Sequence, residues 1–165
     1  YDRQDRKSKA RDPISAKLVA DIISTAGADR VVSLDLHAAQ IQGFFNIPVD
    51  HLLGAPILAS YMKDRIGPAV DEYVVVSAGT LCNAAKAVME RGALSVTACA
   101  SHGVLSGPAL ERLEESPIDE VILLDTIELP PEKRIPKIRQ LSAAPVFAEA
   151  ISRINEDRPV SPMFV

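Results

Sequence analysis

The sequence has few cysteines, no long apolar run and no excess of positive charge, and each of these absences excludes a class of protein. Its two cysteines, Cys82 and Cys99, are too few for a disulfide framework and do not form a CxxC metal motif. They favour a reducing, cytoplasmic setting. The longest apolar runs fall well short of the roughly 18 residues that span a membrane. The formal net charge of -4 argues against a general nucleic-acid binder.

What remains is the composition of an ordinary globular protein. The 165 residues are 47% hydrophobic and 24% charged, which is enough apolar chain for one domain or two small lobes. No internal repeat or low-complexity tract interrupts it. The chain starts at Tyr1 without a methionine or a targeting segment, so we expect it to be part of a longer product.

Apolar patterns alternate between helical and strand-like periods along the chain. The first helix is expected to open at Asp12-Pro13, with an N-cap followed by proline, and to end at Gly27. Further helices are expected at 56–65, 81–91, 107–115 and 145–155, and strands at 30–36, 73–76, 95–100, 121–124 and 160–165. Strands separated by helices of this length predict an α/β fold with parallel sheets flanked by helices. A linker at 64–71 would divide two lobes, 1–66 and 67–165.

The segment Asp35-Leu36-His37 follows the first expected strand. Ligands of parallel sheets bind beyond the carboxyl ends of the strands. Since alternate strand residues face the same side, Asp35 and His37 are expected to converge there. A carboxylate at that edge suits Mg²⁺, and an imidazole suits a nucleotide phosphate or the metal. Alternatively, Asp35 caps the next turn and His37 packs in a polar loop.

Two further segments have phosphate-binding character. The N-terminal stretch carries five cations in eleven residues, namely Arg3, Arg6, Lys7, Lys9 and Arg11. Guanidinium groups suit phosphate oxygens, although a solvated run partly neutralised by Asp2 and Asp5 is equally consistent. The segment from Ser77 to Thr80 joins a strand to a helix, where backbone N–H groups can hold a phosphate. Thr80 could equally be an ordinary N-cap.

Residues 35–50, DLHAAQIQGFFNIPVD, resemble the signature of the phosphoribosyl pyrophosphate (PRPP) synthetases, also called ribose-phosphate pyrophosphokinases. Residues 1–14, 101–112 and 161–164 are similar to the same family, so the resemblance covers nearly the whole chain. It implies two phosphoribosyltransferase-like lobes. It also implies Mg²⁺-dependent transfer of the diphosphoryl group of ATP to the 1-hydroxyl of ribose 5-phosphate, which gives PRPP and AMP.

By the same resemblance, individual residues take roles. ATP would contact His37 and the N-terminal stretch Arg3, Gln4, Asp5, Arg6 and Lys7. His37 would be catalytic and, with Asp35 and Asp50, would serve the metal. Ribose 5-phosphate would lie on Ala78, Gly79 and Thr80. Asn46 stands where some relatives carry an aspartate, which weakens the case for a cation at that position.

The sequence departs from the family pattern ahead of Ala78. Relatives carry an acidic pair there, whereas this chain has Val74-Val75-Val76-Ser77. Several dozen residues, including a flexible catalytic loop with a lysine and an arginine, are expected to be missing between Ser77 and Ala78. A non-catalytic regulatory subunit that associates with active synthetases is therefore an alternative. A phosphoribosyltransferase is a third interpretation, which the 35–50 signature disfavours.

The resemblance also implies partners. Relatives form hexamers built from dimers and bind phosphate or ADP at subunit junctions, where Lys9 and Arg11 would contribute. Of the other notable side chains, His51 is expected at the surface or an interface, and His102 near the ligand-bearing sheet edge without a catalytic role. Cys82 and Cys99 are expected to be small core residues.

Overall fold

The structure, a computed structural model, describes residues 14–67 and 81–164. The expected helix start at Asp12-Pro13, the expected strand 73–76 and the junction between Ser77 and Ala78 lie outside this range. The chain forms two compact units. Unit 1 comprises residues 1–53 and 145–165, and unit 2 comprises residues 54–144.

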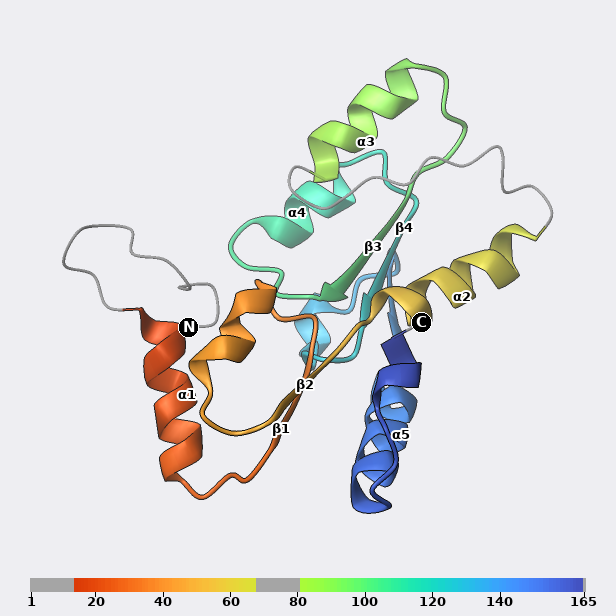
Figure 1. The fold of residues 1–165 in the computed structure, drawn as a ribbon. Helices are drawn as coiled ribbons and strands as arrows, with labels where there is room; N and C mark the ends of the chain where they lie inside the picture. The colour runs from red at the N-terminus through yellow and green to blue at the C-terminus, as the bar shows by residue number, and fades with distance from the viewer. Residues whose placement is uncertain (1–13, 68–80, 165) are drawn as a thin grey trace. The chain divides into compact units, whose positions relative to one another are not determined.

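Unit 1 is built around two parallel strands. Its elements are α1 (Ser15–Thr25), β1 (Val31–Leu34), the 3₁₀ helix η1 (Ala39–Phe44), β2 (Val49–Leu52), α5 (Ala144–Asn155, in this unit from Pro145) and the 3₁₀ helix η5 (Ser161–Phe164). Val31 pairs with Val49 and Leu34 with Leu52, so both strands end at the same edge (Figure 1).

The first helix forms where it was predicted, but its buried face is not the expected apolar stripe, because Leu18 and Ile22 are 57% and 58% exposed. Ala16 and Ala20, one turn apart, are 3% and 0% exposed. Gly27 follows the helix with a φ of 96°, a left-handed conformation that glycine adopts without strain and that commonly ends helices. Lys17 Nζ donates to the carbonyl oxygen of Phe44 at 3.0 Å and so ties α1 to the end of η1.

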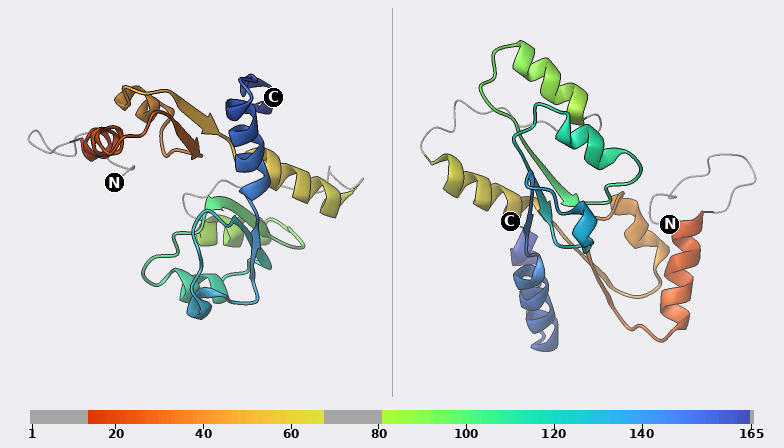
Figure 2. Two further views of the ribbon diagram at one scale, coloured as in Figure 1. Left: turned by 90° about the horizontal axis from the view of Figure 1, so that it is seen from below. Right: turned by 180° about the vertical axis from the view of Figure 1, so that it is seen from behind.

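Unit 2 contains a three-stranded parallel sheet in the order β3-β4-β5. Its elements are α2 (Ala55–Ile66), α3 (Leu81–Glu90), β3 (Thr97–His102), α4 (Ala109–Glu114), β4 (Glu120–Leu124), the 3₁₀ helix η4 (Pro131–Lys133) and β5 (Ile138–Leu141). Figure 2 shows the unit from two further sides, with α3 and α4 near each other beside the strands.

The core of unit 2 lies between the sheet and these two helices. Ala85 of α3 and Leu113 of α4 pack in one buried cluster with Val121 and Leu123 of β4. The alternate β4 residues Ile122 and Leu124 are also fully buried, at 0% exposure each. A strand buried on both faces explains why β4 is a continuous apolar run in the sequence.

The expected α/β fold class, with parallel sheets flanked by helices in two parts, is confirmed. Strands β2 and β5 were not predicted, and the strand predicted at 160–165 is wrong, because Ser161–Phe164 is a 3₁₀ helix. The lobe boundary at residue 66 stays a prediction, and α2 groups with unit 2. Within the part of the chain that the structure describes, no helix is long and apolar enough to cross a bilayer.

Candidate functional site

The carboxyl edge of the β1-β2 pair carries the segment that the sequence singles out. β1 ends at Leu34, and the next residue, Asp35, has a φ of 44°. Aspartate tolerates this left-handed conformation better than most residues. The Asp35 N–H still donates to the carbonyl oxygen of Leu52 at 3.0 Å. Because the chain turns at Asp35, strand alternation does not place Asp35 and His37 on one face, and their convergence stays a prediction.

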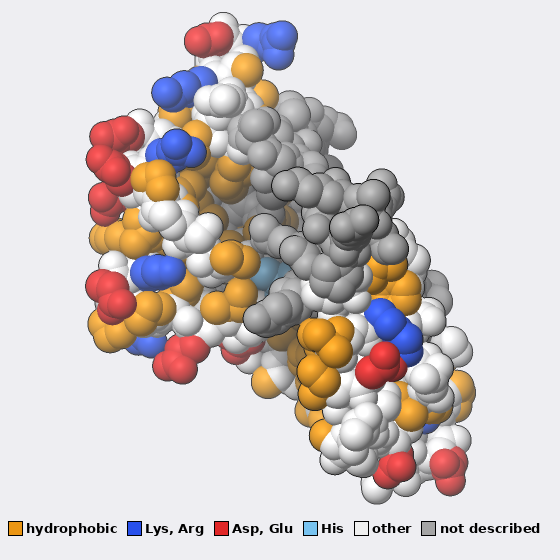
Figure 3. All heavy atoms as spheres, turned by 90° about the vertical axis from the view of Figure 1, so that its left-hand side faces the viewer, with side chains coloured by type: hydrophobic (Ala, Val, Ile, Leu, Met, Phe, Trp, Pro, Cys, Tyr) orange, Lys and Arg blue, Asp and Glu red, His pale blue; other side chains and the backbone are white. Residues whose placement is uncertain are grey.

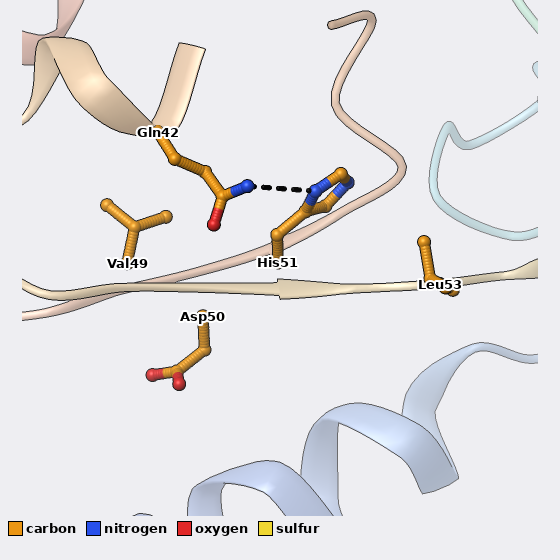
Figure 4. Close-up of a pocket in the computed structure, with 5 residues that line it drawn as sticks. All are labelled: Gln42, Val49, Asp50, His51 and Leu53. Atoms are coloured by element: carbon orange, nitrogen blue, oxygen red, sulfur yellow. Dashed lines mark hydrogen bonds between the residues drawn. The ribbon is translucent and has the colours of Figure 1, made fainter. Parts of the chain in front are cut away.

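A histidine of the neighbouring strand holds the next residue of this turn. The N–H of Leu36 donates to Nε2 of His51 at 2.9 Å. The other ring nitrogen, Nδ1, lies 3.3 Å from the side-chain amide of Gln42 in η1 (Figure 4). The His51 ring is half-buried. His51 was expected at the surface or an interface, and the sequence did not predict its hydrogen bond with the Leu36 N–H.

A small open pocket lies beside this ring. It has a volume of about 300 Å³ and is lined by Gln42, Val49, Asp50, His51 and Leu53. Figure 4 shows the side chains of Val49 and His51 on one side of β2 and that of Asp50 on the other. This division follows from the alternation of side chains along a strand.

Asp50 is paired with a cation. Nε of Arg30 donates to its Oδ2 at 2.6 Å. The Asp50 side chain is 14% exposed and that of Arg30 is 41% exposed. The hydrogen bond from the guanidinium to this carboxylate, with the charge attraction between them, raises the pKa of Arg30. The proposed metal role of Asp50 is untested, and it would require Asp50 to exchange Arg30 for another cation.

The described residues of this edge that could contribute to a metal site are Asp35 and His37. Among the described residues, no three His, Cys, Asp or Glu side chains form a group that could hold a metal. Mg²⁺ usually takes one or two carboxylates and completes its shell with phosphates and waters. Asp35 can supply one carboxylate, and the exposed His37 lies two residues away.

In unit 2, the carboxyl end of β3 carries a second polar group. His102 Nδ1 lies 2.8 Å from Oγ1 of Thr126, which donates to the carbonyl oxygen of Ser101 at 3.0 Å. Gly103 follows directly. A Cβ at this glycine would lie 2.6 Å from Cδ1 of the buried Leu123, so a larger residue there would displace the Leu123 side chain.

The remaining predicted site residues lie outside the described part of the chain. These are the ATP-binding candidates Arg3, Gln4, Asp5, Arg6 and Lys7 and the ribose-phosphate candidates Ala78, Gly79 and Thr80. The structure therefore places Asp35, His37 and Asp50 in unit 1 and leaves the other assignments as predictions.

On the face drawn in Figure 3, acidic and basic side chains of described residues are interspersed with hydrophobic ones.

The parallel sheets place this chain among the α/β proteins, in which ligands bind beyond the carboxyl ends of the strands. Comparison with known proteins narrows this class. Residues 55–165 match the family model of the phosphoribosyl synthetase-associated domain. Residues 1–27 match that of the N-terminal domain of ribose phosphate pyrophosphokinase. The chain belongs to the ribose-phosphate pyrophosphokinase family.

Individual relatives agree with the family models. A ribose-phosphate pyrophosphokinase of Caldanaerobacter subterraneus subsp. tengcongensis is 49% identical over 99% of this chain and 69% of its own length. One of Clostridium acetobutylicum is 47% identical with the same coverage. The crystal structure of phosphoribosylpyrophosphate synthetase from Mycobacterium smegmatis matches with a TM-score of 0.83 and 35% identity, over 95% of this chain and 69% of that one.

These alignments also bear on the expected gap in the chain. The alignment with the Caldanaerobacter protein spans 221 positions, whereas this chain has 165 residues. At least 56 of those positions therefore have no counterpart here. That the missing residues fall between Ser77 and Ala78 stays a prediction.

Proposed function

We propose that this protein is a ribose-phosphate diphosphokinase, which transfers the diphosphoryl group of ATP to the 1-hydroxyl of ribose 5-phosphate. The observation that carries the proposal is the 49% identity, over 99% of the chain, to a protein named ribose-phosphate pyrophosphokinase. A position at the carboxyl edge of parallel strands supports Asp35 and His37 as the nucleotide side of the site.

In the proposed reaction, the 1-hydroxyl oxygen of the sugar attacks the β-phosphorus of ATP in line. The bond between that phosphorus and the oxygen bridging it to the α-phosphorus breaks, AMP leaves with the bridging oxygen, and the hydroxyl proton passes to solvent. No covalent enzyme intermediate is needed, since diphosphoryl transfer depends mainly on positioning and charge stabilisation. PRPP and AMP are the products.

The chain's own residues divide this work. Arg3, Gln4, Asp5, Arg6 and Lys7 would bind ATP, and Ala78, Gly79 and Thr80 would cradle the sugar 5-phosphate. His37 would contact the phosphates. Asp35, and Asp50 once released from Arg30, would hold Mg²⁺, which neutralises charge on the phosphate oxygens when bound.

The proposal extends to setting and assembly. Ribose 5-phosphate and ATP are small cytoplasmic metabolites, and the two cysteines are both free thiols, which fits a cytoplasmic enzyme. We expect a homo-oligomer, a hexamer built from dimers, with phosphate or ADP as a regulatory ligand to which Lys9 and Arg11 contribute. Sedimentation with and without ADP tests the assembly.

AMP release in a coupled assay tests the reaction directly. The gene product that carries this sequence should form AMP only when ATP, ribose 5-phosphate and Mg²⁺ are all present. Asp35→Asn and His37→Ala should each lower kcat by at least about tenfold, or about 1.4 kcal/mol in barrier. Unchanged turnover in both variants would refute the site. No AMP release from the unmodified protein would refute the proposed reaction and favour the regulatory alternative.

A further inference from the structure

The turn that carries Asp35 and His37 is held at two successive backbone positions. The Asp35 N–H continues the β1-β2 ladder by donating to the Leu52 carbonyl oxygen at 3.0 Å. At the next residue the ladder has ended, and the Leu36 N–H donates to the His51 ring instead. A side chain of β2 thus takes over from the backbone at the point where the chain turns away from the sheet.

The chemistry of this contact fixes the direction of the hydrogen bond. A backbone N–H can only donate, so Nε2 of His51 is the acceptor of this hydrogen bond at 2.9 Å. The side-chain amide nitrogen of Gln42 lies 3.3 Å from Nδ1 on the other side of the ring (Figure 4), and this nitrogen donates to the carbonyl oxygen of Ala39 at 3.1 Å. The ring is therefore confined between η1 and the turn.

The contact bears directly on the site because Leu36 lies between Asp35 and His37 in the sequence. Asp35 holds a left-handed φ of 44°, which an aspartate tolerates but which still constrains the path of the chain at the turn. Without an acceptor at His51, the Leu36 N–H loses the hydrogen bond that ties it to β2. A small displacement of groups that position phosphates costs rate steeply.

We propose that His51 is a positioning residue, whose Nε2 holds the Leu36 N–H and thereby presents Asp35 and His37 to the nucleotide. The claim that His51 holds the Leu36 N–H rests on the observed hydrogen bond. The claim that this contact matters for catalysis rests on the proposed diphosphokinase function. His51 does not contact the reacting atoms in this account. It acts through the backbone of Leu36, which lies between Asp35 and His37, the two residues proposed to contact the metal and the nucleotide.

A pair of variants of similar size separates the hydrogen bond from packing. His51→Leu fills the space without an acceptor, whereas the side-chain oxygen of His51→Gln can accept the Leu36 N–H near the position of Nε2. Amide hydrogen exchange, measured by NMR on the intact chain, is the first readout. Leu36 should exchange about tenfold faster in His51→Leu and within about threefold of the parent in His51→Gln.

The Asp35 amide serves as the internal reference, because it bonds to Leu52 and not to His51. Its exchange should be the same in all three proteins. Equal Leu36 exchange in all three proteins would overturn the proposal. Joint loss of protection at Asp35 and Leu36 in both variants would also overturn it, since His51 would then support the whole sheet edge.

Kinetics with MgATP supply the second readout. His51→Leu should lower kcat/KM by about tenfold, and His51→Gln should restore it to within about threefold of the parent. Normal kcat/KM in His51→Leu, with the parent protein active, would overturn the positioning role. An inactive parent protein would instead refute the proposed function, and the exchange measurement would still decide whether His51 holds Leu36.

Discussion

Lys137 provides a test of how one ammonium group fastens a helix to its sheet. The residue precedes β5, and its Nζ donates to the carbonyl oxygens of Leu113 at 3.1 Å, Glu114 at 3.0 Å and Ser116 at 2.9 Å. These carbonyls lie in the last turn of α4 and just beyond it, where helices leave acceptors without internal partners and where a positive charge is favourable.

Lys137→Met removes the ammonium group and keeps most of the apolar stem. The Leu113 carbonyl oxygen keeps hydrogen bonds from the backbone N–H and the hydroxyl of Ser116. The expected loss of unfolding free energy therefore comes from the contacts to the Glu114 and Ser116 carbonyl oxygens. At about 1 kcal/mol for each, the free energy of unfolding should fall by about 2 kcal/mol. For a chain of this length the Tm should fall by about 4–8 °C.

Urea unfolding followed by far-UV circular dichroism measures the loss. Lys133→Met is a matched control, because Lys133 Nζ makes one comparable contact, to the Leu105 carbonyl oxygen at 2.9 Å. It should cost about 1 kcal/mol or less. A loss below about 0.5 kcal/mol in Lys137→Met, or equal losses in the two variants, would refute the reasoning from carbonyl contacts.

Two further predictions concern the sheets. Leu52→Ala, at a position 1% exposed, should cost about 2–5 kcal/mol of unfolding free energy. Leu53→Ala, at a position 41% exposed, should cost less than about 1 kcal/mol, and similar losses in urea titrations would contradict the placement of the core. Burial, and secondarily the charge of Glu120, raises the pKa of the Cys99 thiol. Iodoacetamide should therefore alkylate Cys99 more slowly in the folded than in the unfolded chain at pH 8.5. Glu120→Gln should speed the reaction of the folded chain by lowering the pKa of the Cys99 thiol. A slower reaction in the variant would contradict the effect assigned to Glu120.

The sequence predicted those elements whose apolar period is unambiguous. β4 is a continuous apolar run because both of its faces are buried, and α1 carries an apolar stripe that ends at Gly27. β2 was missed because Asp50 and His51 interrupt it with two polar side chains in four residues. β5 was missed for a similar reason, since Arg139 and Gln140 are polar. Patterns that mix polar and apolar residues over four positions do not distinguish a short strand from a loop.

Sequence analysis identified residues of the candidate site but did not predict which residues contact one another there. Asp35 and His37 were identified from their position after a strand and from a family resemblance, and both are sequence-local signals. Strand alternation does not extend to Asp35, because β1 ends at Leu34 and the chain turns there, a conformational detail that no residue pattern specifies, so the convergence of Asp35 and His37 stays a prediction. The link between Leu36 and His51 was missed because it joins residues 15 positions apart through the parallel register of β1 and β2.

The end of the chain shows the same limit. Val160 is buried, and four of the five residues after it are apolar, which favours a strand on composition alone. Pro162 has no N–H to donate to a ladder, and the Met163 N–H donates to the Val160 carbonyl oxygen at 2.9 Å instead. This 3₁₀ turn satisfies the backbone locally, and η5 takes the place of the strand predicted at 160–165.

The position of the cation beside the nucleotide tests the central claim most directly. Crystals of the protein soaked with Mn²⁺ and a non-hydrolysable ATP analogue would locate the metal by its anomalous scattering. The account predicts a manganese peak within coordination distance of the Asp35 carboxylate, with the triphosphate beside His37. A peak elsewhere, with the turn at Asp35 empty of metal and nucleotide, would contradict it.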